Sequence, residues 1–62
     1  MMWDVMIHHK NGTKYCDMDG WHDNWSVTTW TTEPSFEDAE KTRDELAKGN
    51  PWNTVWIEPH ED

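Results

Sequence analysis

The sequence predicts an α+β domain, with one mainly antiparallel four-stranded sheet and a single helix packed on one face, in the order β-β-β-α-β. Three observations support this fold: an Asn11-Gly12 pair between two segments of alternating apolar and polar residues, a third segment rich in Thr and Val, and one capped segment with helical spacing. The chain has 62 residues, so we expect a single domain, residues 1–62, with a small core.

The first two strands are predicted to form a hairpin. Apolar residues alternate with other residues over Met2–His9, as in a strand with one buried face. Asn11-Gly12 is a strong hairpin signal, because both central positions of a type I′ turn need a positive φ. Lys14–Met18 then returns as the second strand, and Asp17–Asn24 follows as a polar, turn-rich loop.

The helix is predicted over Phe36–Lys48. Ser35 is a suitable N-cap, and Asp38 three residues later offers an approximate capping box. Gly49 is a natural residue to follow the last turn, and Pro51 blocks any continuation. These signals are local, so they define both ends of the helix.

Two further strands complete the predicted sheet. Trp25–Thr32 has a high strand propensity, and Trp52–Glu58 follows the helix, ahead of an acidic tail over Pro59–Asp62. Alternation predicts that the helix-facing residues are Trp3, Val5, Ile7, Val55 and Ile57, joined by Trp25, Val27 and Thr29. The opposite face, which no second layer covers, is then expected to carry Met2, Met6, Trp30 and Trp56.

Charge and cysteine content narrow the classes of function. Thirteen Asp and Glu against five Lys and Arg give a net charge of -8, which opposes binding to nucleic acid and favours a protein partner with a basic surface. One cysteine, Cys16, cannot form a disulfide within the chain and fits a reducing compartment. No targeting or membrane segment is apparent, so we expect a cytoplasmic protein that contacts no membrane. Because the chain is short and has no internal disulfide, we also expect a homodimer.

Metal, cofactor and catalytic sites are not predicted. The Asp17–Asn24 loop is acidic, but it lacks the glycine position and the terminal Glu of a calcium-binding EF-hand, so a solvated turn is the preferred interpretation. His8 and His9 are adjacent on a predicted strand and would point to opposite faces. Cys16 lacks any metal-ligand spacing and any recognisable catalytic motif around it. A non-enzymatic role is therefore expected, and binding of a cation by the loop stays open.

Six tryptophans are the main functional signal in the sequence. One small core does not easily bury six indole rings, because each is bulky and carries an N–H that needs a partner. We predict that a protein partner binds an aromatic and acidic surface made by Trp30, Trp56, Met6, Glu37, Glu40, Asp19 and Trp21. Two alternatives remain: a tryptophan-lined site that sequesters a small molecule or nucleotide, and a purely structural oligomeric module.

Trp3-x-Val5, Ser35–Glu40 and Val55–Glu58 follow one another as strand, capped helix and strand. In this layout the chain resembles short acidic bacteriophage accessory proteins of the anti-defence or host-takeover kind. That resemblance implies an inhibitor that acts in the host cytoplasm by blocking a host protein or its small-molecule signal. It carries over no particular binding or catalytic residue.

Overall fold

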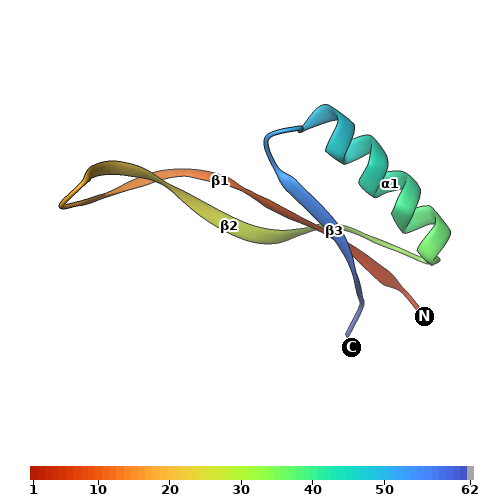
Figure 1. Ribbon diagram of the computed structural model, residues 1–62. Coiled ribbons are helices and arrows are strands. Elements are labelled where there is room, and N and C mark those ends of the chain that lie inside the picture. Colours follow the sequence, from red (N-terminus) through yellow and green to blue (C-terminus); the bar gives the residue numbers. More distant parts are fainter. Residues whose placement is uncertain (62) are drawn as a thin grey trace.

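The chain forms a three-stranded antiparallel sheet with one helix against one of its faces (Figure 1). This computed structural model describes residues 1–61. The elements are β1 (Trp3–Asp17), β2 (Gly20–Glu33), α1 (Phe36–Gly49) and β3 (Thr54–Pro59). Both neighbours of β1 run antiparallel to it, giving the order β2-β1-β3. The α+β class agrees with the sequence, but the prediction of four strands was wrong.

The strand count differs because Asn11-Gly12 forms a bulge and not the hairpin turn. Lys10 pairs with Trp25 and Lys14 pairs with Asp23, so residues 11–13 lie opposite a single residue of β2. Gly12 supplies the positive φ of +86° that this bulge needs. The side-chain oxygen of Asn11 accepts the backbone N–H of residue 13 at 3.0 Å, which holds the extra residues in place. The two predicted N-terminal strands are therefore one continuous strand.

The hairpin turn lies instead at Met18-Asp19. Neither residue has a positive φ, so the turn is not type I′, and Gly20 takes the positive φ of +114° directly after it. Asp17 Oδ1 accepts the backbone N–H of Asp19 at 2.8 Å and stabilises the turn. Most of the predicted Asp17–Asn24 loop is consequently the first part of β2.

The helix agrees closely with the sequence prediction and ends one residue later. Ser35 Oγ accepts the backbone N–H of Asp38 at 3.1 Å, as expected of an N-cap. At the other end, the backbone N–H of Asn50 donates to the carbonyl of Ala47 at 3.2 Å. The last strand begins at Thr54, two residues later than the predicted start at Trp52. It includes Pro59, which was predicted to belong to the tail, and Asp62 lies outside the described residues.

The core is small and lies between α1 and the sheet. Its buried apolar side chains are Val5, Ile7, Ala39 and Leu46, with Trp3, Val55 and Ile57 packed against them. All five helix-facing residues predicted in the first and last strands are confirmed. The ring of Phe36 meets that of Trp3 edge to face, with centroids 4.9 Å apart.

A second bulge reverses the predicted faces of β2. Val5 pairs with Thr31, whereas Met6 pairs with Thr29, so Trp30 is an extra residue without a register partner. Because side chains alternate along a strand, one inserted residue moves everything beyond it to the other face. The prediction that Trp25, Val27 and Thr29 face the helix was therefore wrong.

The sheet divides into two regions of different build. β3 pairs only with residues 3–8 of β1, and beyond them β1 and β2 continue as a two-stranded ribbon without a helix above it (Figure 1). We call residues 9–26 the arm and the rest of the described chain the body. The molecule is correspondingly elongated, measuring 45 × 27 × 14 Å. Among residues 1–61, no helix is long and apolar enough to cross a membrane.

Candidate interaction surface

The sheet face opposite α1 is the main candidate site, and we call it the open face. The register and the alternation of side chains place these residues on it in the body and at the base of the arm: Asp4, Met6, His8, Lys10, Trp25, Val27, Thr29, Thr32, Thr54, Trp56 and Glu58. No helix or strand of residues 1–61 covers this face, since α1 packs on the other side.

The open face continues past the bulge to the tip of the arm. Lys10 lies before the bulge and Lys14 after it, yet both ammonium groups reach the carboxylate of Asp23, at 3.0 and 3.6 Å. Side chains two residues further along share that face, so Cys16 and Trp21, which pair across the strands, extend it to the tip. Trp21 is 72% exposed, which is a larger fraction than for any other exposed aromatic side chain among the described residues.

Trp25 is the centre of this surface. The imidazole of His8 stacks on its indole with ring centroids 5.0 Å apart and planes inclined by 22°. Lys10 Nζ lies 5.8 Å from the indole centroid, within range of a cation–π contact. These neighbours fix the ring in place while leaving it 41% exposed. Trp25 is thus an ordered aromatic group available for contact.

Both lysines of the arm form ion pairs with one carboxylate, that of Asp23. Hydrogen bonding from Lys10, with added attraction from Lys10 and Lys14, holds the pKa of Asp23 below its usual range. Asp23 therefore stays ionised at neutral pH and ties the two lysines together across the ribbon. The arm as a whole contains three carboxylates and two lysines, whereas the rest of the sequence contains ten carboxylates and three basic residues. Negative charge is concentrated in the body.

At the body end, the open face is more closely packed. Met6 and Trp56 pair across β1 and β3, and both are half-buried. The hydroxyl of Thr29 lies 3.4 Å from the sulfur of Met6 and joins β2 to the pair. Met6 and Trp56 are therefore less accessible to a partner than Trp21 and Trp25, which are exposed.

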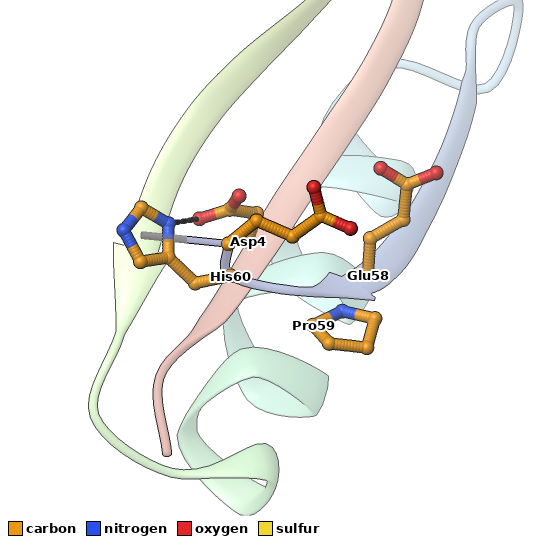
Figure 2. A pocket seen from close by; sticks show the side chains of 5 residues that line it. Asp4, Glu58, Pro59 and His60 are labelled. Carbon is orange, nitrogen blue, oxygen red and sulfur yellow. Dashed lines mark hydrogen bonds and ion pairs between the residues drawn. The ribbon is translucent and has the colours of Figure 1, made fainter.

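A cavity of about 410 Å³ lies where the open face meets the C-terminal segment (Figure 2). Asp4, Glu58, Pro59, His60 and Glu61 line it. His60 Nδ1 donates to Asp4 Oδ1 at 2.9 Å, and the Thr32 hydroxyl donates to the same oxygen at 2.7 Å. Hydrogen bonding from Thr32, followed by the contact with His60, lowers the pKa of Asp4 despite some desolvation. No tryptophan lines this cavity, so it does not provide the predicted tryptophan-lined ligand site.

The sequence-predicted site residues do not all come together. Met6 and Trp56 are paired on the open face, and Trp21 lies on its far end. Asp19 is exposed in the turn at the tip, while Glu37 and Glu40 belong to α1 in the other layer. Trp30 is 61% exposed. Because it is the inserted residue of the bulge, strand alternation does not assign its side chain to either face.

Sequence reasoning missed Trp25, His8 and Lys10 as a group. His8 and Lys10 follow Met6 at intervals of two, so alternation along the first strand was a usable signal. Trp25 could not be added to them from sequence, because its face depends on the bulge at Trp30. Among residues 1–61, no cluster of three or more His, Cys, Asp or Glu side chains is arranged to hold a metal ion.

Comparisons of the chain with known protein families, with curated proteins and with solved structures find no match.

Proposed function

We propose that this is a stoichiometric binding protein that contacts a protein partner through the open face, with the arm as the principal contact. The observation that carries the proposal is the row of apolar side chains along that face. Trp21, Trp25 and Val27 are all exposed, and Met6 and Trp56 continue the row. Exposed aromatic side chains on an ordered scaffold are the usual anchors of protein interfaces.

The shape of the surface favours a protein partner over a small ligand. Small-molecule sites are concave and bury most of the ligand. The open face is one side of a thin sheet, and the cavity at its edge is lined by carboxylates and not by indoles. A tryptophan-lined pocket for a nucleotide therefore has less support than a flat contact.

The charge distribution supports a partner with a basic surface. Ten carboxylates outside the arm attract such a partner over a distance of about 8 Å at physiological ionic strength. The arm itself has nearly balanced charge, so it can make close contact without removing many carboxylates from water. In this proposal the body accelerates association and the arm controls dissociation. Inhibition of a host protein, as in phage accessory proteins, stays a prediction within this proposal.

Two tryptophans make a matched test. Trp21 on the open face is 72% exposed, and Trp52 in the turn before β3 is 69% exposed, so neither Trp21→Ala nor Trp52→Ala removes core packing. The tagged chain and both variants are used to isolate partners from cell lysate, and dissociation constants are then measured for the protein recovered. Trp21→Ala should weaken binding by about 30-fold, the equivalent of a hot spot of about 2 kcal/mol.

Trp52→Ala should bind as the unmodified protein does. Raising the salt concentration should slow association of all three proteins, because the attraction from the body is screened. A partner that binds Trp21→Ala with full affinity, once the variant shows a native circular dichroism spectrum, would refute the open-face proposal.

A further inference from the structure

The outer edge of β2 is a long strand edge that lacks charged, glycine and proline residues over its central part. β2 has 14 residues and pairs on one side with β1, and no strand of residues 1–61 occupies its other side. Residues 24–32 form a run of nine without a charged side chain, a glycine or a proline. Natural edge strands usually carry charges, prolines or bulges that prevent pairing with another chain, and a single bulge at Trp30 is present in this run.

The other free edges are protected in the expected way. Beyond residue 8, the outer edge of β1 carries Lys10 and Lys14 and is interrupted by the bulge at residues 11–13. The remaining edge belongs to β3, which has only six residues and ends in Glu58-Pro59. The contrast within one sheet singles out β2 as an edge suited to accept a further strand.

The charge distribution points to how a second copy of this chain fits this edge. Two acidic bodies repel one another, so a parallel or side-by-side approach is unfavourable. Antiparallel pairing centred on Thr28 matches the uncharged run with itself. Glu33 of one copy then falls near Asp23 of the other, where Lys10 and Lys14 hold that carboxylate in ion pairs. The two Glu33 residues, where the acidic body begins, lie about 34 Å apart at about 3.4 Å per residue. That separation is about four Debye lengths at physiological salt, so the repulsion is largely screened.

We propose that two copies of the chain pair antiparallel about Thr28, through residues 26–30 of β2 between the two bulges at Trp30, and form a continuous six-stranded sheet. The run is its own complement, because it has no charge to match and its Thr and Val side chains suit a sheet surface. A strand from another protein would benefit from the acidic body only if that strand carried basic residues. The uncharged run offers no charged side chain with which such residues could pair. The small core, with four buried apolar side chains, adds a reason for further pairing.

The symmetry of this pairing has a consequence for the open face. A two-fold axis normal to the sheet reverses strand direction and keeps each face on its own side. Both helices then lie on one side of the six-stranded sheet, and the two open faces join on the other. The inference concerns the strand edge and stands independently of partner binding on the open face.

The test measures association of the full chain by sedimentation equilibrium with a matched pair of Thr→Lys variants. Thr28 is exposed at the centre of the run, and Thr54 is exposed on β3 at the opposite edge of the sheet. The unmodified chain should sediment at about twice its mass of 7.5 kDa at tens of micromolar. Thr28→Lys should raise the dimer dissociation constant at least tenfold, because two ammonium groups meet at the axis. Thr54→Lys should leave it unchanged.

Amide hydrogen exchange on the unmodified protein gives a second readout that does not depend on a variant folding. Alternate amides within residues 26–30, those whose N–H groups point away from β1, should gain protection as the protein concentration rises. A chain that stays monomeric at hundreds of micromolar overturns the inference. So does a dimer that Thr54→Lys disrupts and Thr28→Lys does not, and so does a dimer in which these edge amides remain unprotected.

Discussion

The body and the arm are stabilised by different kinds of contact. In the body, Val5 and Ile7 of the sheet are buried against Ala39 and Leu46 of the helix. In the arm, no side chain of residues 9–26 is fully buried. The body therefore has a hydrophobic core, and the arm is a ribbon held by contacts between its own two strands.

The contacts across the arm are individually modest. The ring of Tyr15 stacks on that of His22 with centroids 5.2 Å apart, and the amide of Asn24 donates to the hydroxyl of Thr13 at 3.0 Å. Cross-strand pairs of this kind contribute about 0.2–1 kcal/mol each. A two-stranded ribbon is marginal by itself in water. The difference indicates that the body holds the fold, while the arm places its aromatic groups at the surface for contact.

The largest effect should come from the core of the body. Leu46→Ala should lower the free energy of unfolding by about 3 kcal/mol, because it leaves a cavity under the helix. A domain of this size has a total stability of only about 3–9 kcal/mol, so the substitution should remove about a third of it or more. Urea denaturation measures the loss, and Met18→Ala at the exposed tip is the control, with a change within about 0.5 kcal/mol. A loss below 1 kcal/mol for Leu46→Ala would show that the core does not hold the fold.

Two glycine substitutions should have the next-largest effects on stability, one in the arm and one in the body. Gly20 has a φ of +114°, so Gly20→Ala should destabilise the arm by about 1–2 kcal/mol although open space surrounds the added methyl group. Gly49 at the end of the helix has no positive φ and also faces open space, so Gly49→Ala should stabilise the body by about 0.5 kcal/mol. Arm amides of Gly20→Ala should exchange about tenfold faster, while its urea midpoint stays unchanged. Equal effects on both regions would mean that the arm and body unfold as one unit.

The smallest predicted effect concerns the pKa values of two carboxyl groups, one in each region. Lys10 holds the pKa of Asp23 low in the arm, and Thr32 holds that of Asp4 low in the body. Lys10→Gln should raise the pKa of Asp23 and leave that of Asp4 unchanged, as NMR titration of the carboxyl carbons would measure. A lowered folded-state pKa stabilises at a pH above the ordinary value of 3.8, and the contribution is lost as the pH falls through the folded-state value. The arm of the unmodified protein should therefore open more readily on acidification below pH 3.8, and Lys10→Gln should weaken that dependence. An unchanged Asp23 pKa in the variant would contradict the assignment.

The sequence was sufficient where the determinants are local. Ser35 caps the start of the helix and Pro51 lies two residues beyond its end, as predicted, whereas Gly49 is the last helical residue and not the one that follows it. The alternation of Val5 and Ile7 likewise predicted the core face of the first strand.

The sequence was insufficient where a position depends on its partner strand. Asn11-Gly12 provides a positive φ in either a turn or a bulge, and only the pairing with β2 decides between them. The bulge at Trp30 lies in a stretch of similar Thr residues, so no local signal marks the inserted residue. The position of Trp25 on the open face depends on this bulge, so it could not be predicted from the sequence either.

Amide hydrogen exchange along β1 is the most direct test of the division between body and arm. The hydrogen-bonded amides of residues 3–8 and 14–17 belong to one strand and lie on either side of the bulge at residues 11–13. At a protein concentration at which sedimentation shows a monomer, residues 14–17 should exchange at least about a hundredfold faster than residues 3–8, because the arm opens without the core. Equal protection on both sides of the bulge would contradict the account, since the arm would then share the stability of the core.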